Sequence, residues 1–487
     1  MSRNLKKLTI LHSNDMHGDF LAEHVDEQLM GGISMLSGYV TRVRANNPFS
    51  IYCIAGDMLQ GSLIDAEYRG LSTIEIMNML APDIVSLGNH EIDYGVAHLL
   101  FLERCANFPI VCANLFIKNP YRRLFSPYQI MEINGMTILF IGVITQEVAA
   151  NLRMDALLGS LVDVEEAALE VGRICNAHRS LDVDLTVLLT HIGHEEDRKL
   201  AALLDPIWGV DLIIGGHSHT ILEEPEVVND ILIAQAGVGT AQIGHFDLIV
   251  DTDSNSIDSY QWRLVPITGE MCPRDLQLEE TILNFKQTVD EKYDRVICRF
   301  RRSFTHPNRY QETELGNLIS DALKDALALD LVLCASGSIR KQQVGPLFTY
   351  GDLCATFPFD EPIYVLKIKG SQLRHMLDNI LYQEISEGGH GEFYQVSRGL
   401  RLSYHRESRT FDYLEYQGQH LADEEVMRVG LQLYHFKNFE RFFDLPLKEL
   451  VDGKGQIVCT SSMDVLEEYF SETKSVRGRV EGRIVIR

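Results

Sequence analysis

No stretch of this sequence approaches the ~20 consecutive apolar residues that a helix needs to cross a bilayer. The apolar run nearest the N-terminus covers residues 8–11 and ends at His12, so it is too short for the core of a signal peptide. We therefore expect a protein that stays in the cytoplasm and has no membrane partner.

Positive charge is also scarce. The chain has 44 Lys and Arg residues against 69 Asp and Glu residues, a formal net charge of −25. This balance disfavours electrostatic binding to a nucleic acid polymer or to an anionic membrane. An anionic substrate would need a local source of positive charge, and a bound metal ion is one such source.

Cysteine pairing is the third absence. The nine cysteines are an odd number, lie scattered mostly within apolar runs and form no C-x-x-C motif. The pattern is typical of reduced, buried thiols rather than of a disulfide framework or a thiolate zinc site. It is the pattern of a cytosolic protein.

What the sequence does contain is an alternation of short apolar strands and helices. We expect strands at 8–11, 51–55, 83–87, 110–112, 137–144, 183–189 and 210–214, and helices near 31–44, 72–80, 162–180 and 195–204. This alternation predicts an α/β fold. Antiparallel strands within 231–250 and 258–266 would then close the first domain.

The length of the chain predicts more than one domain. We place the first domain at 1–276 and the second, also α/β, at 297–487. Between them, residues 277–296 are polar and helix-prone and form a predicted connecting helix.

Polar side chains follow five of the expected strands. The five clusters are Asp15/His17, Asp57, Asn89/His90, His191 and His217/His219. A lone histidine or a Gly-Asp pair at a strand end is usually structural. Five clusters in one domain indicate a site instead, since open α/β sheets bind ligands beyond the carboxyl ends of their strands.

Seven of these side chains are candidate metal ligands: Asp15, His17, Asp57, Asn89, His191, His217 and His219. They are too many for one ordinary cation, so we predict two divalent ions that share Asp57. Nitrogen and oxygen ligands without thiolate suit Mn, Fe, Zn, Co or Ni. Two such ions form a clamp for displacement at phosphorus by a bridging hydroxide.

The motifs D-x-H, G-D, G-N-H-E, T-H and G-G-H-S-H occur here in a set order. In that order they resemble the calcineurin-like metallophosphoesterases. Together with the second domain, the chain resembles the 5′-nucleotidase family, and within it a bacterial cytoplasmic member. The resemblance implies a four-layer α/β/β/α sandwich followed by an α/β domain that binds the substrate.

The resemblance also assigns the ligands to two metals. One metal is held by Asp15, His17, Asp57 and His219, and the other by Asp57, Asn89, His191 and His217. His90 is implied as the imidazole that stabilises the transition state or protonates the leaving oxygen. Asp93, three residues on, can orient that ring and raise its pKa. The alternative for Asp93 is a helix N-cap or a first-turn carboxylate.

The second domain is implied to recognise the nucleoside by stacking two aromatic rings on the base. The candidate substrate contacts are Phe393 and Tyr434 as rings, Gln395 for a base edge, Glu440 for the ribose and Arg340 for phosphate or ribose. Phe393 and Gln395 lie in the G-E-F-Y-Q-V motif, where a buried strand residue is the alternative for the phenylalanine. The family motifs N-G-G-G-I-R and N-D-Y-x-x-x-G-G-D-G are only partly present.

The sequence therefore predicts a phosphohydrolase that depends on two metal ions and releases phosphate from nucleotides. UDP-sugar or cyclic-nucleotide phosphodiesterase activity is the alternative, because all of these reactions are displacements at phosphorus. A non-catalytic nucleotide-binding sensor is the alternative of another class. The intact set of seven ligands plus His90 disfavours a sensor, which has no need of them.

Overall fold

The computed structural model describes residues 3–25, 28–118, 121–146, 158–161, 163–383, 392–473, 476 and 478–487. The chain divides into two compact units, Met1–Val289 and Asp290–Arg487. The helix α8 (Leu276–Tyr293) contains the point of division.

Two six-stranded sheets form the N-terminal unit. The strand order of the first sheet is β17 (Ser256–Pro266), β16 (Gln242–Asp251), β1 (Leu5–Ser13), β4 (Ser50–Ala55), β5 (Ile84–Ser86) and β6 (Ile110–Val111). The order of the second is β14 (Glu226–Val228), β15 (Ile231–Ala234), β13 (Leu212–Ile214), β12 (Leu185–His191), β10 (Met136–Ile144) and β9 (Tyr128–Ile133). Strands β1, β4, β5 and β6 are parallel to one another, as are β10, β12, β13 and β15.

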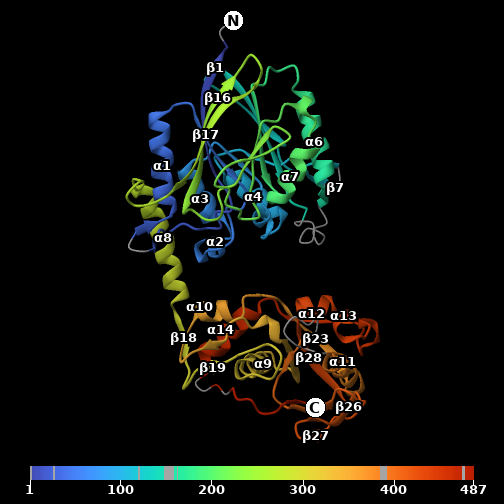
Figure 1. Ribbon diagram of the computed structural model, residues 1–487. Helices are drawn as coiled ribbons and strands as arrows, with labels where there is room; N and C mark the ends of the chain where they lie inside the picture. The colour runs from blue at the N-terminus through green and yellow to red at the C-terminus, as the bar shows by residue number, and fades with distance from the viewer. Residues whose placement is uncertain are drawn as a thin grey trace. The chain divides into compact units, whose positions relative to one another are not determined.

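These two sheets pack face to face. Ile10 and Cys53 of the first sheet share a buried apolar core with Phe140 and Val187 of the second. On the outer face of the second sheet lie α6 (Val164–Ala177) and α7 (His194–Leu203), and on the outer side of the first lie α1 (Ile33–Asn46) and α3 (Leu71–Leu80) (Figure 1). The α/β class expected from the sequence is confirmed, with helices outside a double sheet.

The remaining elements of this unit are short. They are β2 (Glu23–Val25), β3 (Gln28–Met30), α2 (Leu63–Tyr68), the 3-10 turn η1 (His90–Ile92), α4 (Val96–Cys105), β7 (Leu115–Lys118), β8 (Tyr121–Arg123), β11 (Leu158–Leu161) and the 3-10 turn η2 (Pro206–Trp208).

One strand differs from the sequence-based expectation. Residues 231–250 contain β15, which is parallel to β13, as well as β16, which is antiparallel to both β1 and β17. All four residues of β15 are buried. A short, fully apolar strand is typical of a parallel strand covered on both faces, so β15 extends the second sheet instead of closing the domain.

The C-terminal unit is built on two smaller sheets. The five-stranded sheet has the order β24 (Tyr394–Val396), β20 (Leu331–Ala335), β28 (Val426–Gln432), β23 (Ile363–Lys369) and β29 (Gln456–Cys459). The four-stranded sheet has the order β27 (Gln419–His420), β26 (Thr410–Tyr416), β25 (Leu400–His405) and β30 (Ile484–Ile486). Two-stranded ribbons pair β18 (Val296–Arg299) with β22 (Leu347–Thr349) and β19 (Phe304–Thr305) with β21 (Gln343–Val344).

Helices of the C-terminal unit pack on these sheets. They are α9 (Glu314–Ala326), α10 (Tyr350–Thr356), α11 (Gly370–Tyr382), α12 (Leu433–Lys437), α13 (Phe439–Phe443) and α14 (Ser462–Glu472), with 3-10 turns η3 (Ser336–Ser338) and η4 (Leu447–Glu449). Among the helices of the two described units, none is long and apolar enough to cross a membrane.

Candidate metal centre

The polar clusters predicted from the sequence meet at one place in the N-terminal unit. Three overlapping groups of side chains each have ligand atoms within 4.8 Å of one another. The groups are Asp15/His17/His219, His17/Asp57/His90 and Asp57/His191/His217. The structure therefore brings together the ends of β1, β4 and β5 from one sheet and of β12 and β13 from the other.

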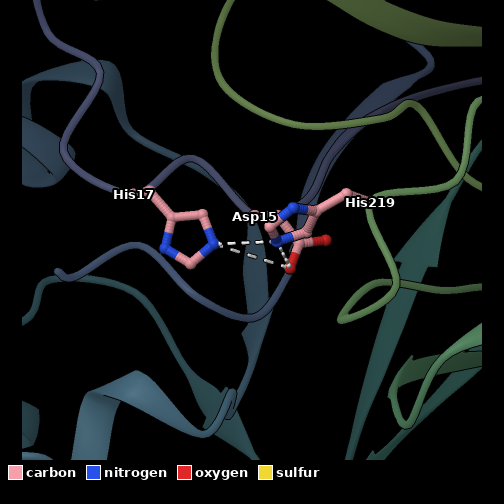
Figure 2. A group of neighbouring side chains, drawn as sticks. All are labelled: Asp15, His17 and His219. Atoms are coloured by element: carbon pink, nitrogen blue, oxygen red, sulfur yellow. Dashed lines mark hydrogen bonds and ion pairs between the residues drawn. The ribbon is translucent and has the colours of Figure 1, made fainter. Parts of the chain in front are cut away.

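Asp15, His17 and His219 form one side of this centre (Figure 2). The Nε2 atoms of the two imidazoles face each other at 3.1 Å. The Oδ1 atom of Asp15 lies 3.4 Å from Nε2 of His219 and 3.9 Å from Nε2 of His17. Three donor atoms thus converge on a common point, as the ligands of a cation do.

Asp57 joins this side to the other. Its Oδ2 atom lies 3.9 Å from Nε2 of His17 and 3.0 Å from Nε2 of His191. Nε2 of His191 also lies 3.1 Å from the amide oxygen Oδ1 of Asn89. One carboxylate therefore faces donor atoms on both sides, which is the position of a ligand shared by two ions.

Backbone carbonyls set the direction of two imidazoles. Nδ1 of His191 lies 2.9 Å from the carbonyl oxygen of Ala55, and Nδ1 of His17 lies 3.1 Å from that of Gln60. A carbonyl oxygen only accepts, so Nδ1 is the protonated nitrogen in each ring. Nε2 is then the ring nitrogen that faces the centre and that would bind a metal ion once it has lost its proton.

Backbone strain marks the same residues. Five of the seven candidate ligands have left-handed φ angles: Asp15 (50°), His17 (48°), Asp57 (53°), His217 (80°) and His219 (54°). Non-glycine residues in this conformation cost about 1–3 kcal/mol each and persist where the surrounding structure enforces them. Their concentration at one point indicates that the chain is held in a strained shape to aim these side chains.

Two glycines allow the ligand turns to approach one another. A Cβ at Gly88 would lie 2.3 Å from both the backbone nitrogen and Oδ1 of Asp57. A Cβ at Gly216 would lie 2.5 Å from the carbonyl oxygen of Ala55. Any side chain at these two positions would push the ligand-bearing turns apart.

The electrostatics of the centre favour positive charge. Burial lowers the pKa of His191, but the adjacent Asp57 carboxylate outweighs it, and the pKa is raised to about 9. A buried cluster of carboxylates and imidazoles is stable only with paired charges or a metal ion. The donor atoms, the directions of the imidazole rings and the negative charge of the carboxylates all fit divalent cations.

His90 stands beside the centre in a different role. Its Nδ1 lies 2.6 Å from Oδ2 of Asp93, and its backbone N–H donates to Oδ1 of Asp57 at 2.9 Å. The hydrogen bond to Asp93 raises the pKa of His90. The N-cap of the following helix, α4, is Gly95 rather than Asp93, so the capping alternative for Asp93 is not observed.

Sequence reasoning missed the role of Glu91. Its buried carboxylate accepts hydrogen bonds from the backbone N–H groups of Asp57, Met58, Leu59 and Gly88. Burial, together with the nearby Asp57 charge, raises its pKa to about 7. Glu91 thereby fixes the turns that carry Asp57 and Asn89. Glu91 is the fourth residue of the G-N-H-E motif, but the motif alone does not show that its carboxylate binds the turn of Asp57.

In the C-terminal unit, a cavity of about 440 Å³ contains two of the predicted substrate contacts, Arg340 and Tyr434. The Tyr434 ring is half exposed, and the Arg340 guanidinium stacks over the exposed Phe359 ring at 5.1 Å. Arg309, Phe359, Glu361, Arg441 and Phe442 also line this cavity and were missed. The one sequence signal for Phe359 is the F-P-F-D-E-P run at 357–362, in which two prolines indicate a loop that carries this aromatic residue.

The other three expected contacts do not lie on this cavity. Phe393 is 2% exposed and Gln395 is fully buried. The amide of Gln395 binds the backbone N–H of Thr313 and the carbonyl of Gln311, so its hydrogen bonds are already used within the fold. Glu440 is exposed and is not among the lining residues. Phe393 and Gln395 thus expose almost no surface to a substrate, whereas the role expected for Glu440 stays a prediction. Gly391, the first residue of the G-E-F-Y-Q-V motif, lies outside the described residues.

An α/β double sheet with carboxylates and imidazoles converging at its strand ends defines a metal-dependent hydrolase. Comparison with known proteins specifies the class further. Residues 8–220 match the family model of the calcineurin-like phosphoesterases, and residues 289–445 match that of the 5′-nucleotidase C-terminal domain. The chain thus joins a calcineurin-like metallophosphoesterase domain to a 5′-nucleotidase C-terminal domain, and it is a metal-dependent phosphoric ester hydrolase.

Similar proteins span nearly the whole chain. A 5′-nucleotidase of Mus musculus is 25% identical over 98% of this chain and 90% of its own length. The crystal structure of a 5′-nucleotidase precursor from Thermus thermophilus is 27% identical, covers 99% of both chains and has a TM-score of 0.60. A NAD nucleotidase structure from Haemophilus influenzae, 17% identical with a TM-score of 0.57 over 99% of both chains, shares the fold. The expected fold class and enzyme class are confirmed.

Proposed function

We propose that this enzyme releases phosphate from nucleotides, acting on small molecules rather than on nucleic acid polymers. The observation that carries the proposal is the convergence of six further side chains with metal-donor atoms on Asp57, in a domain joined to a 5′-nucleotidase C-terminal domain. The mouse and Thermus relatives, which are named as 5′-nucleotidases, support the same substrate class. The nine unpaired cysteines support a cytoplasmic location.

Two divalent ions are part of the proposal. Asp15, His17, Asp57 and His219 would hold one, and Asp57, Asn89, His191 and His217 the other. The nitrogen and oxygen donors suit Mn, Zn, Fe, Co or Ni. When bound, such ions supply an activated water and neutralise the phosphoryl oxygens.

His90 and Asp93 supply the proton chemistry in this proposal. Asp93 holds the Nδ1 side of the ring at 2.6 Å, and the backbone bond to Asp57 fixes the ring beside the metal ligands. The pKa of His90 is raised, so the imidazolium form is more populated near neutral pH. His90 would stabilise the charged phosphoryl group and protonate the leaving oxygen. A nucleotide sensor would have no use for this pair.

The cavity of the C-terminal unit would hold the nucleoside. Tyr434 and Phe359 offer exposed rings for stacking on a base, and Arg340 and Arg309 offer guanidinium groups for phosphate or ribose. Stacking does not depend on the identity of the base, so this cavity would accept nucleotides with different bases. A UDP-sugar or a cyclic nucleotide presents the same groups and remains the alternative substrate.

A substrate panel tests the proposal. Chelator-treated full-length protein, reloaded with Mn²⁺, is offered nucleoside 5′-monophosphates, nucleoside diphosphates, cyclic nucleotides and UDP-sugars, with a sugar phosphate for comparison. Chromatography of the products measures the turnover of every substrate, since cyclic nucleotides and UDP-sugars release no free phosphate. We expect turnover to be fastest for a 5′-monophosphate, which yields a nucleoside and phosphate, and to disappear with excess chelator. Faster turnover of a cyclic nucleotide or UDP-sugar would favour the alternative, and turnover of the sugar phosphate alone would overturn the nucleotide assignment.

A further inference from the structure

A buried glutamine lies directly behind the turn that carries two of the proposed metal ligands. Gln235 follows β15 and is fully buried. Its Nε2 donates to Oδ2 of Asp197 at 3.1 Å and to the carbonyl oxygen of Gly216 at 3.3 Å. Its Oε1 accepts from Oγ of Ser218 at 3.1 Å and from the backbone N–H of Thr220 at 3.3 Å. Three of these four bonds hold the turn of His217 and His219.

The side chain of Gln235 is tightly packed against the start of this turn. A Cβ at Gly215, where the turn begins, would lie 2.7 Å from Nε2 of Gln235 and 2.1 Å from Oδ2 of Asp197. Asp197 is itself fully buried and accepts a 2.6 Å hydrogen bond from Oγ1 of Thr190, the residue before His191. The network behind the turn therefore extends to the strand of a third proposed ligand.

The residues after Gln235 reach the opposite sheet. The backbone N–H of Ala236 donates to Oδ1 of Asn14 at 2.9 Å, and Nδ2 of Asn14 donates to the carbonyl of Gly237 at 2.6 Å. Nδ2 of Asn14 also donates to Oδ2 of Asp15 at 2.7 Å. One short segment, 235–237, thus contacts the turn of His217 and His219 directly and reaches the carboxylate of Asp15 through Asn14.

We infer that Gln235 is a positioning residue: it binds no metal itself, but it fixes the turn of His217 and His219 relative to Asp15 so that their side chains meet. The inference rests on the proposed function, since it assigns Gln235 to the site proposed above. His217 and His219 have left-handed backbones that relax unless the surrounding structure holds them. Partners of this kind set ligand direction and thereby metal affinity.

The test measures metal binding rather than activity. Metal-free full-length protein is titrated with Mn²⁺ alone, and free Mn²⁺ is followed by electron paramagnetic resonance. Gln235→Met keeps the length of the side chain and removes its four hydrogen bonds. We expect it to weaken Mn²⁺ binding about 10- to 100-fold. The control is Gln395→Met, an equally buried glutamine of the C-terminal unit, which we expect to bind Mn²⁺ as the wild type does.

A second variant covers the case in which Gln235→Met does not fold. Ser218 is an exposed residue whose hydroxyl donates to Gln235, and we expect Ser218→Ala to weaken Mn²⁺ binding in the same direction by a smaller factor. Thermal unfolding of the metal-free variants separates the two roles, because a merely structural glutamine lowers the melting temperature without changing affinity. Wild-type affinity in a folded Gln235→Met or Ser218→Ala variant overturns the inference alone. A wild-type protein that binds no Mn²⁺ overturns the proposed function as well.

Discussion

Nδ1 of His90 lies 2.6 Å from Oδ2 of Asp93, three residues further along the chain. The backbone N–H of the same histidine donates to Oδ1 of Asp57, the carboxylate at the middle of the proposed metal centre. His90 is therefore tied to a proposed metal ligand through its backbone and to a second carboxylate through its ring. This separation of roles makes the contribution of each residue measurable.

Replacing His90 should remove the proposed proton donor while leaving the proposed ligands in place. His90→Asn should lower kcat about 10²- to 10⁴-fold, the usual contribution of a general acid, with metal content unchanged. The matched control is His98→Asn, because the His98 ring binds the carbonyl of Arg69 and is not part of the centre. Steady-state kinetics with metal analysis of the same samples checks this. Loss of metal in His90→Asn would make it a ligand instead.

Asp93 should act only through His90. Asp93→Ala should lower kcat by a smaller factor than His90→Asn, since the ring remains but loses its orientation and its stabilised charge. In the His90→Asn background the same change should have almost no further effect, because the two residues act as one unit. A double-mutant cycle of kcat measures this coupling. Additive losses would show that Asp93 has a separate role.

Tyr434 should contribute to substrate binding and not to the chemical step. Removing a ring that stacks on a base costs about 1–3 kcal/mol, so Tyr434→Ala should raise KM roughly 5- to 160-fold with kcat little changed. Tyr413→Ala, an exposed tyrosine that does not line the cavity, is the control. Initial rates over a wide substrate range give both constants. An unchanged KM would remove Tyr434 from the binding site.

His12 should make the fold sensitive to acid. It is fully buried between Trp262 and Phe246, and burial lowers its pKa from 6.5 to about 3. Because the folded pKa lies below the unfolded one, the stability contributed by neutral His12 is present above pH 6.5 and is lost as the pH falls toward 3. The full contribution is about 4–5 kcal/mol at most.

A ring without a titratable group should remove this dependence. His12→Phe should flatten the decline in the free energy of unfolding between pH 6.5 and 4, whatever its effect at neutral pH. The same substitution at exposed His24 should leave the slope unchanged. Urea unfolding of the metal-free protein at several pH values provides the slopes. An equally steep decline in His12→Phe would place the acid sensitivity elsewhere.

The sequence predicted where the proposed metal ligands lie because each of them follows an apolar strand. Asp57 after β4 and His191 at the end of β12 are visible as polar residues where a buried run stops. Parallel strands then bring such residues to one edge without any knowledge of side-chain contacts. The ligand turns could therefore be located from local pattern alone.

The supporting residues could not be found in the same way. Gln235 contacts Asp197 and the turn of His217. Asn14 contacts Gly237, which lies more than two hundred residues further along the chain. These hydrogen bonds form only because the two sheets pack together, and the periodicity of the sequence does not show how they pack. The alternation in G-E-F-Y-Q-V likewise predicts a strand but not its environment, and the structure buries both Phe393 and Gln395.

Two cations are proposed to lie on either side of Asp57. Crystals of the full-length protein grown with Mn²⁺, measured near the manganese absorption edge, would show bound metal directly as anomalous difference density. We predict two peaks that share the Asp57 carboxylate, one also bonded to Asp15, His17 and His219 and the other to Asn89, His191 and His217. A single peak, or density remote from Asp57, would contradict the account.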